Sequence, residues 1–357
     1  MQYDTPTTSA QVNETLAATE GLAPETRQQI EQILGTAPGG SATTVDVGYF
    51  DGSSLSAPPN TPVEMLVIAP PPPSSPGTLI PIVIPQAVLQ TASAYVFEGN
   101  AGVEVTFNTV ERVIAASQGG DRITVNGDRN TTLDGSGGND TLVTSGGNDS
   151  ITGGDGNDSI TSGTGNDTIV SGMGDDTIDG GAGRDAVTIA GNKANYTVTV
   201  VDGDLRVTNK ANTSVESKIS NVEFVGFNNG ESIAVAANND EAEVLRLYQA
   251  VLGRDADKAG ADYWVDVLNT GATSDVGIAN AFLNSTELNV NGPLSNEQFI
   301  DALYANALDR AADEAGKAYW LNDLANGQER ANIAINIVGS AEAASHIDGV
   351  IIITGQI

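Results

Sequence analysis

The hydrophobic pattern of residues 135–188 repeats every nine positions. Short triplets rich in β-branched and aliphatic residues, such as Thr141–Val143 and Ser159–Thr161, alternate with six-residue stretches of Gly, Ser, Asn and Asp. The triplets predict short strands in which the eighth residue of each nine points inward, and the glycine-rich stretches predict tight turns. Two nines then make one coil of two strands and two turns. A fixed period of this kind is typical of a parallel β-helix.

Four positions of the nine keep their residue type along the block. Position eight is aliphatic in all six units, from Leu142 to Val187. Position four is glycine throughout, at Gly138, Gly147, Gly156, Gly165, Gly174 and Gly183. Position six is aspartate throughout, at Asp140, Asp149, Asp158, Asp167, Asp176 and Asp185. Position five is asparagine in the first four units, at Asn139, Asn148, Asn157 and Asn166.

The stacked aspartates need a counter-charge. Like charges at strand spacing repel by about 1 kcal/mol in water, and by more when they are partly desolvated. Calcium prefers roughly six to eight oxygen ligands, which carboxylates and turn carbonyls can supply, whereas magnesium requires a smaller octahedral shell. We therefore expect several Ca²⁺ ions at the turns, with the residues of positions four, five and six as candidate ligands.

This nine resembles the RTX (repeats-in-toxin, haemolysin-type) calcium-binding repeat. The unit Gly153–Thr161, GGDGNDSIT, matches the RTX pattern at every defined position. The resemblance implies a β-roll in which one turn and the turn two nines later hold an ion between them, so six turns would hold roughly four ions. A disordered Gly/Ser/Asp-rich linker is the alternative, but such a linker would not keep phase over six units.

The chain ahead of the repeats is predicted to hold three segments. Residues 1–56 form a polar arm with one short helix over Pro24–Leu34, favoured by proline in the first turn and by Glu25 near the positive helix end, and with a strand and turn over residues 45–56. Residues 57–85 contain most of the chain's prolines and form a linker or an edge strand that covers the open end of the β-helix. The apolar run Leu79–Ile84 could instead pair with another chain.

Residues 86–134 predict degenerate coils that cap the repeats. Strands are expected at residues 94–97, 103–107, 111–114 and 122–125. Arg122 and Arg129 stand in or near the acidic position of what resemble decayed nines, where a side-chain cation would replace the charge of calcium. After the repeats, residues 189–237 predict a second β cap, with a hairpin around Asp202-Gly203.

Residues 238–357 predict a small all-α domain with an internal duplication. The segment Leu247–Trp264 recurs as Leu303–Trp320 at an offset of 56, and Phe282–Glu287 recurs as Ile337–Glu342 at an offset of 55. The shared pattern LY…LGR.AD..G..YW resembles a helical domain of unknown function that accompanies RTX repeats in secreted bacterial proteins. The overall fold class is therefore a multidomain β + α chain: a parallel β-helix or β-roll with β caps, followed by a helical domain.

Side-chain roles in the helical domain follow from the shared pattern. The Arg and Asp three residues apart are predicted to lock the turn between two helices. Asp255, Asp257, Gly260 and Asp266 are spaced as in an EF-hand loop, but Ala259 occupies a ligand position and the second copy begins with Ala311, so calcium is not expected there. His346 is expected at a helix end or on the surface. Four aromatic side chains are predicted to fill the core, with sugar stacking by the tryptophans as the alternative: Tyr263, Trp264, Tyr319 and Trp320.

Composition narrows the choice of function. Fifteen Lys+Arg against 46 Asp+Glu give a net charge of −31, which argues against nucleic acid or anionic lipid as a partner. Cysteine is absent and histidine occurs once, so disulfides, thiol catalysis and HExxH zinc sites are excluded. No GxSxG elbow and no phosphate-binding GxxxxGK[ST] loop occurs in the sequence. We expect a chain without enzymatic activity.

Two features concern localisation. The first 26 residues contain no Lys, no Arg and no apolar run, so no N-terminal signal peptide is expected, and no apolar stretch is long enough to span a membrane. The RTX resemblance implies one-step type I export from a Gram-negative bacterium. The apolar ending Gly349–Ile357 is either the export signal or a buried last strand.

Together these patterns predict an extracellular or cell-surface structural protein that folds on calcium. Self-assembly into a surface layer, a filament or a biofilm matrix is the favoured role, with itself or other surface components as partners. The alternative is an adhesin whose helical domain holds a glycan or a second protein. A carbohydrate-active β-helix enzyme is a third possibility, since acidic residues are plentiful.

Overall fold

The computed structural model describes residues 7–19, 22–38, 40, 42, 44–58, 62–75, 77–108 and 112–354. The chain divides into two compact units. Unit 1 holds residues 1–190 and 194–222, and unit 2 holds residues 191–193 and 223–357. The domain boundaries expected at residues 56, 85 and 134 stay a prediction; all three fall within unit 1.

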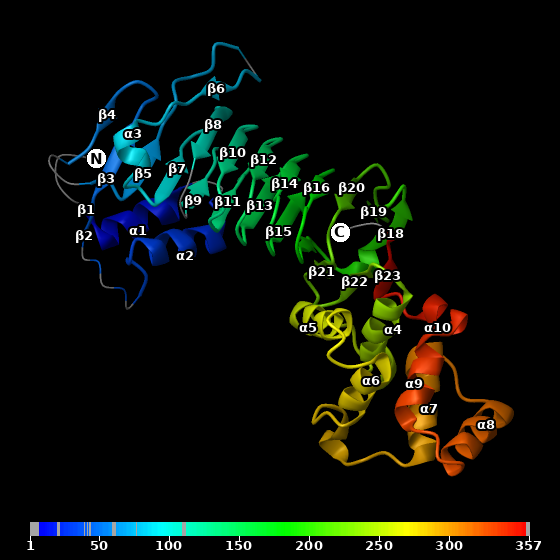
Figure 1. The fold of residues 1–357 in the computed structure, drawn as a ribbon. Coiled ribbons are helices and arrows are strands. Elements are labelled where there is room, and N and C mark those ends of the chain that lie inside the picture. The colour runs from blue at the N-terminus through cyan, green and yellow to red at the C-terminus, as the bar shows by residue number, and fades with distance from the viewer. Residues whose placement is uncertain are drawn as a thin grey trace. The chain divides into compact units, whose positions relative to one another are not determined.

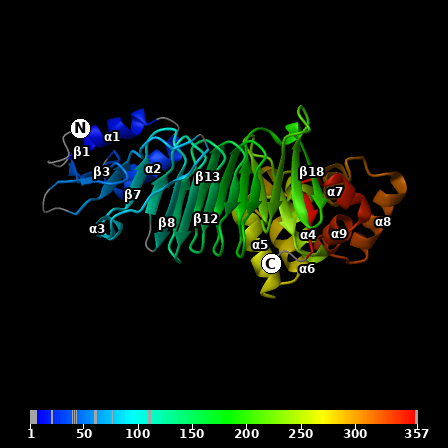
Figure 2. The same cartoon turned by 90° about the horizontal axis from the view of Figure 1, so that it is seen from above.

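Unit 1 is a solenoid of two mainly parallel sheets, whose strands stack one after another along the repeat block (Figures 1 and 2). The first sheet, in chain order, consists of β6 (Ile80–Pro81), β8 (Val103–Asn108), β10 (Arg122–Asn126), β12 (Thr141–Thr144), β14 (Ser159–Thr161), β16 (Thr177–Asp179), β18 (Tyr196–Val201), β19 (Asp204–Asn209) and β20 (Glu216–Ser220). The second sheet of unit 1 consists of β3 (Val47–Phe50), β4 (Leu55–Ser56), β5 (Met65–Ile68), β7 (Ala94–Phe97), β9 (Arg112–Ala115), β11 (Thr131–Asp134), β13 (Ser150–Asp155), β15 (Thr168–Met173) and β17 (Ala186–Ile189).

The register of the repeats confirms a coil of two nines. Leu142 lies opposite Ile160, which lies opposite Ile178, each 18 residues further along the chain. On the other sheet Ile151, Ile169 and Val187 align in the same way. All six side chains are at most 1% exposed. The core of the repeat block is therefore two columns of single aliphatic side chains, as the period predicts.

The coils ahead of the repeats have a thicker core. Tyr95 and Phe107 pack edge to face with ring centroids 4.8 Å apart, and Phe97 is also fully buried. Two helices, α1 (Ser9–Ala18) and α2 (Pro24–Ile33), lie alongside the strands at this end of unit 1 (Figure 1). Their buried side chains Val12, Leu16 and Ile30 form one apolar cluster with residues of β3, β5, β7 and β9. Helix α2 confirms the expected helix, whereas α1 was not expected from the sequence.

The proline-rich segment contributes to both sheets. Strand β5 is fully buried and pairs in parallel with β3 and β7, so it is an internal strand of the stack. Strand β6 pairs with β8 at the end of the first sheet, as the edge-strand interpretation predicts. Val83 just after it is 82% exposed. A four-residue helix, α3 (Gln86–Leu89), leads on to β7, and the two-residue strands β1 (Thr7–Thr8) and β2 (Thr44–Val45) pair antiparallel.

The predicted strands and hairpin around the repeats are present. Strands β7, β8, β9 and β10 cover the four segments expected ahead of the repeats, except that residues 109–111 lie outside the described part. Strands β18 and β19 form the expected hairpin, and its turn residues Asp202 and Gly203 have φ of 55° and 88°. Strand β20 pairs in parallel with β16 and antiparallel with β19, so the hairpin lies at this edge of the first sheet.

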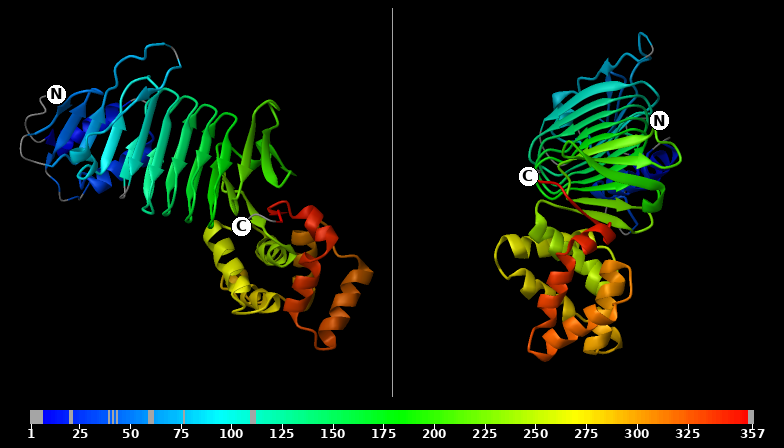
Figure 3. Two further views of the ribbon diagram at one scale, coloured as in Figure 1. Left: turned by 45° about the horizontal axis from the view of Figure 1, so that its top comes forward. Right: turned by 90° about the vertical axis from the view of Figure 1, so that its right-hand side faces the viewer.

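Unit 2 consists of a small sheet and a helical bundle, seen from two sides in Figure 3. The sheet contains β21 (Phe224–Phe227), β22 (Ser232–Ala236) and β23 (Val350–Ile352), with β23 parallel to β22. The helices are α4 (Asn239–Leu247), continued by a π-helical turn over Tyr248–Leu252, then α5 (Lys258–Asn269), α6 (Asp275–Leu283), α7 (Asn296–Leu308), α8 (Glu314–Ala325), α9 (Arg330–Val338) and α10 (Ala341–His346); a 3₁₀ turn covers Leu288–Asn291. No helix within the described ranges is both long and apolar enough to cross a membrane.

One expectation for unit 2 is corrected, and one open alternative is found in the structure. Trp264 and Trp320 pack against the core as expected, but Tyr263 and Tyr319 are 59% and 58% exposed, because they lie on the outer side of α5 and α8. The described part of the chain ending forms the partly buried strand β23, one of the two alternatives, and Ile353 just after it is only 3% exposed. Residues 355–357 lie outside the described part, and the export role of this ending stays a prediction.

Candidate calcium-binding site

The position-four glycines bring stacked turns into backbone contact. Their φ angles lie between 100° at Gly147 and 146° at Gly183, a region that side chains disfavour. A Cβ built on Gly156 would lie 1.8 Å from the carbonyl oxygen of Gly138 in the preceding coil. The same distance separates a Cβ on Gly165 from the Gly147 oxygen. Only glycine allows the turn carbonyls to come this close to the next coil.

The position-six aspartates form two rows, one at each turn edge. The first row contains Asp140, Asp158 and Asp176, and the second contains Asp149, Asp167 and Asp185. Within each row, the Oδ1 atom accepts a hydrogen bond from the backbone amide of the aspartate one coil earlier, at 2.7–3.1 Å. All six residues are at most 2% exposed. The chain thus buries a row of carboxylates at each edge of a thin apolar core.

The second carboxylate oxygen of these residues has no donor. The Oδ2 atoms of Asp140, Asp149, Asp158, Asp167 and Asp176 are buried and accept no hydrogen bond. A buried polar group left without a partner costs roughly 1–3 kcal/mol, and more if it is charged. Five such oxygens in consecutive turns are a large cost for a core of single aliphatic side chains.

Burial also shifts the titration of these carboxyls. It raises the pKa of Asp140 to about 8, that of Asp176 to about 7 and that of Asp149 to about 6, because the charged form is desolvated. Burial likewise raises the pKa of Asp158 and Asp167. For Asp140 and Asp176, neighbouring aspartates add a smaller upward shift. The protein alone therefore disfavours the ionised carboxylates.

The donor set fits calcium. A buried carboxylate oxygen without a hydrogen-bond donor is available to a cation, and turn carbonyls such as that of Gly138 supply further hard oxygen atoms. No group of three or more His, Cys, Asp or Glu side chains suitable for a metal occurs among the residues that the structure describes. An ion at these turns would therefore depend on single aspartates and backbone carbonyls from successive turns.

The position-five asparagines hold the turns together. The Oδ1 atom of Asn139 accepts from the backbone amide of Asn157 at 2.9 Å, and that of Asn157 accepts from Asp175 at 3.0 Å. The Oδ1 atoms of Asn148 and Asn166 accept hydrogen bonds from backbone amides of the next coil in the same way. These bonds give each asparagine a structural role. Calcium ligation by the residues of positions four, five and six stays a prediction.

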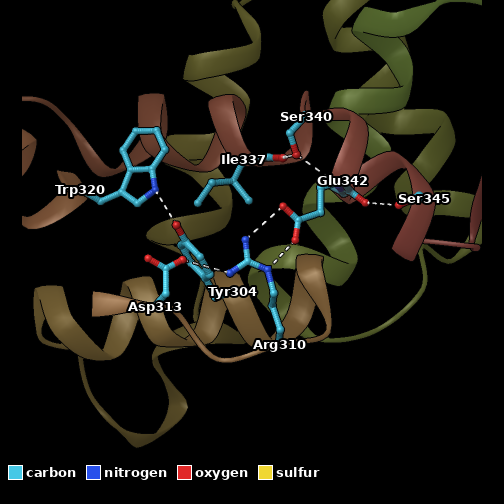
Figure 4. Close-up of polar contacts among 9 residues, drawn as sticks. Tyr304, Arg310, Asp313, Trp320, Ile337, Ser340, Glu342 and Ser345 are labelled. Atoms are coloured by element: carbon cyan, nitrogen blue, oxygen red, sulfur yellow. Dashed lines mark hydrogen bonds and ion pairs between the residues drawn. The ribbon is translucent and has the colours of Figure 1, made fainter. Parts of the chain in front are cut away.

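Unit 2 contains a second repeated constellation, in which one arginine connects three side chains (Figure 4). Arg310 forms a two-pronged pair with Glu342, with Nε 2.5 Å from Oε1 and Nη2 3.1 Å from Oε2, and its guanidinium lies 4.9 Å from the centroid of the Tyr304 ring. Arg310 also lies 3.5 Å from Asp313, the N-cap of α8. The first copy repeats this arrangement with Arg254, Glu287, Tyr248 and Asp257.

This constellation confirms that the Arg–Asp pair locks the turn before the next helix, and it adds a glutamate and a tyrosine that the pattern did not indicate. It also rules out the EF-hand spacing as a metal loop. Asp257 accepts from the amide of Gly260 at 2.9 Å, and α5 begins at Lys258, so the supposed loop is helical. His346 is the last residue of α10 and is exposed, as expected.

Family comparisons agree with the geometry of the repeats. The model described as "RTX calcium-binding nonapeptide repeat (4 copies)" matches residues 125–160, 134–169 and 152–187. Residues 125–187 are an RTX repeat block. The model described as "Domain of unknown function (DUF4214)" matches residues 234–291 and 279–347, in agreement with the duplication. Neither a curated protein nor a solved structure matches the chain significantly.

The RTX assignment supports a general statement about function. RTX repeats imply calcium binding and a bacterial protein secreted by a type I system. Neither family description names a catalytic activity.

The structure corrects the expected roles of two arginines ahead of the RTX block. Arg122 lies on the surface, 3.8 Å from Glu104, with both side chains 53% exposed. Asn130 accepts from the amide of Asn148, so it occupies position five and Arg129 occupies position four. The position-six residue of that turn is Thr131, whose amide donates to Asp149. Neither arginine therefore occupies an acidic position.

Two buried aspartates were missed. Asp121 continues the first row, because its amide donates to Oδ1 of Asp140 at 2.7 Å. Its signal in the sequence is the spacing to Ile123, which equals the spacing from Asp140 to Leu142. The carboxylate of Asp134 accepts hydrogen bonds from the backbone amides of Ser136, at 2.9 Å, and Ala23, at 3.1 Å. The bond to Ala23 ties the start of α2 to the strands of unit 1. Asp134 is harder to recognise from the sequence, because it lies outside the nine-residue repeats.

Proposed function

We propose that this chain is an extracellular calcium-binding structural protein whose RTX block orders when calcium neutralises its buried aspartates. The observation that carries the proposal is the set of five buried Oδ2 atoms without a donor, at Asp140, Asp149, Asp158, Asp167 and Asp176. Export to a medium rich in calcium would supply the ion, and binding only to the folded state would stabilise that state.

Calorimetric titration of the calcium-free chain with CaCl₂ tests this proposal. Roughly four ions per chain are expected, with MgCl₂ a poor substitute because Mg²⁺ gives up its water reluctantly. A chain that takes up no calcium, at concentrations up to those of the extracellular medium, would contradict the proposal.

Self-assembly is the role that we propose for the folded protein. The first sheet ends in β6 on one side and in β18 on the other, and edge strands are sites at which another chain can pair. Val83 beside β6 is 82% exposed, and Val200 and Val201 on β18 are 43% and 44% exposed. A contact between two different ends leaves a free end on each copy, so copies would add in a row unless the rotation between them closes a ring.

Electron microscopy and light scattering in calcium and in EGTA test this role. We expect assemblies in calcium only, and fewer of them for the double variant V200K/V201K, whose charges oppose pairing at the edge. V170K, on the 39% exposed Val170 of a central coil, is the matched control and should leave assembly unchanged. Dispersed monomers in both buffers would count against assembly.

Binding of a glycan by the helical domain is the second candidate function. Tyr263 and Tyr319 are exposed at equivalent positions of the two copies, and each packs edge to face on its neighbouring tryptophan at 4.9 and 4.8 Å. Rigid exposed rings of this kind can stack on sugars. Retention on immobilised polysaccharide that is lost in Y263A/Y319A would support this function, whereas equal retention of both proteins would exclude these rings from it.

A further inference from the structure

We propose that the calcium requirement of the stack begins at Asp140, and that the coils ahead of it, from β3 to β10, are a calcium-independent seed on which the RTX coils order. This inference rests on the proposal that the RTX aspartates bind calcium. It divides one continuous solenoid into two parts that are stabilised by different interactions.

Asp121 and Asp140 are neighbours in the same row but differ in how their oxygens are satisfied. Asp121 accepts from the amide of Val103 at Oδ1, at 2.6 Å, and from the amide of Ser117 at Oδ2, at 2.8 Å. The Ser117 hydroxyl lies 3.0 Å from both oxygens. Asp140 has a donor at Oδ1 only, and its Oδ2 is buried without one. Asp121 therefore has no vacant buried oxygen to offer a cation.

The difference follows from the residue that ends the strand before the turn. Ala115 pairs with Asp134, so Ser117 and Ser136 occupy equivalent places, each four residues before its aspartate. The amide of Ser136 donates to Oδ1 of Asp134 at 2.9 Å, whereas Ala115 has no side-chain acceptor and the amide of Ser117 donates to Oδ2 of Asp121. Alanine in place of Asp134 thus leaves a backbone donor for the carboxylate of Asp121.

The coils of the seed also bury more apolar surface. Inside the stack they contain Tyr95, Phe97 and Phe107, and aromatic side chains bury about 150–250 Å² each. Each strand of the RTX block contributes one aliphatic side chain at the equivalent depth, such as Leu142 or Ile160. Because burial of apolar surface stabilises the folded state in proportion to its area, a coil of the seed gains more from burial than an RTX coil does.

Helices α1 and α2 cover the outer face of the seed as well. Strands β5, β7 and β9 are buried on both faces, whereas the outward side chains of β15 are exposed. Asp134 receives the amide of Ala23 at the start of α2, which ties the helices to the last coil before the repeats. A coil that is buried on both faces does not need an ion for its stability.

The last strand of the seed, β10, can pair directly with β12 of the first RTX coil. Strand β10 pairs with β12 in register, with Ile123 opposite Leu142, and the two strands lie side by side in Figure 1. When the two strands pair, the backbone amide of Asp121 also donates a hydrogen bond to Oδ1 of Asp140. Because each solenoid repeat contacts only its neighbours, order would pass from this edge along the RTX block as calcium binds.

Hydrogen exchange measured by mass spectrometry on the full chain tests the proposal. In EGTA, peptides within residues 65–126 should keep slow exchange while peptides within residues 141–179 exchange freely; calcium should slow the second group alone. Free exchange of both groups in EGTA, with recovery of both in calcium, would overturn the seed but leave calcium binding intact. Equal protection of both groups in both buffers would refute calcium binding itself, and the boundary with it.

A pair of variants in the same row locates the boundary independently. D121N should leave the calcium stoichiometry unchanged and lower stability equally in calcium and in EGTA, because its partners are amides. D140N should reduce the stoichiometry by at least one ion. Equal loss of calcium from both variants would place Asp121 among the ligands and overturn the proposed boundary.

Discussion

At the scale of single residues, position six of the RTX nine combines a short acidic side chain with a turn that buries it. One oxygen of each carboxylate is used by the backbone of the preceding coil, and for five of the aspartates the other is buried without a donor. The backbone therefore satisfies one oxygen of each carboxylate, and under the proposed function a cation would satisfy the other. Stability would then depend on what occupies the turn.

The raised pKa values predict opposite pH dependences with and without calcium. In EGTA, Asp140 and Asp176 bind protons more tightly when folded, with pKa of about 8 and about 7, than when unfolded, near 3.8. The folded state then holds more protons between about pH 4 and 8, so its stability is greatest at low pH and falls as pH rises through this window. In saturating calcium, protons compete with the ion, so stability should rise over the same window. The β signal in circular dichroism from pH 5 to 8.5, in EGTA and in calcium, would show whether the folded fraction changes with pH in opposite directions.

Glycine at position four predicts a large effect of a single methyl group. Gly156→Ala places a Cβ 1.8 Å from the oxygen of Gly138 at a φ of 136°, so backbone must move, and we expect a loss of more than about 3 kcal/mol in calcium. Gly99→Ala is the matched control, since Gly99 has a φ of 92° but nothing within 4 Å of its Cβ. It should cost about 1–2 kcal/mol from strain alone. Equal losses in urea unfolding would show that contact between coils is unimportant.

Sequence reasoning located the RTX aspartates because their period is unbroken, and the structure places all six in buried rows. It missed Asp121 because one inserted residue shifts the phase from 18 to 19 between Asp121 and Asp140. It placed Tyr263 and Tyr319 in the core because they are aromatic and adjacent to tryptophan. Only helix geometry, which turns adjacent residues away from each other, shows that these tyrosines face solvent.

At the scale of elements, the two units use different devices to fix a turn. The RTX coil relies on glycine and stacked side-chain-to-backbone bonds. The DUF4214 copy relies on an arginine that pairs with a glutamate, contacts a tyrosine ring and reaches the N-cap aspartate of the next helix. The planar guanidinium suits these three tasks because it forms two parallel bonds and lies over a ring at the same time.

This geometry predicts that lysine cannot replace arginine in the helical domain. R254K loses the two-pronged pair with Glu287 and should lower the melting temperature of unit 2, and R254A should lower it further. K258A is the control, since Lys258 and Asp262 form an i,i+4 ion pair on one helix and such pairs contribute little. Tryptophan fluorescence reports on unit 2 alone, because Trp264 and Trp320 are the chain's two tryptophans. A melting temperature of R254K equal to that of K258A would remove the special role of the arginine.

The two N-terminal helices show what the sequence reveals about an element. Helix α2 was predictable from Pro24 and Glu25 at its start. Helix α1 buries only Val12 and Leu16, and its capping box is formed by Thr8 and Gln11, so neither its apolar pattern nor its start is conspicuous. Its stability comes from packing on the strands, which the local sequence does not reveal.

At the scale of the whole molecule, our proposals divide the chain into an RTX block that depends on calcium and parts that rely on ordinary packing. The net charge of −31 is concentrated neither in a tail nor in a single acidic run, and a substantial share of it belongs to the buried rows. Under the proposed function such a chain would gain order when calcium becomes available, in keeping with the secreted character that RTX repeats imply. Assembly and glycan binding would then depend on the folded state.

The most direct measurement is a calcium titration of the metal-free chain followed by far-UV circular dichroism. The account predicts a reduced β signal in EGTA, which rises as calcium is added and does not rise with magnesium. The variant with asparagine at Asp140, Asp149, Asp158, Asp167 and Asp176 should show no rise. A wild-type β signal and melting temperature that stay the same after exhaustive EGTA treatment and in calcium would contradict the central claim, because the buried aspartates would then be stable without any ion.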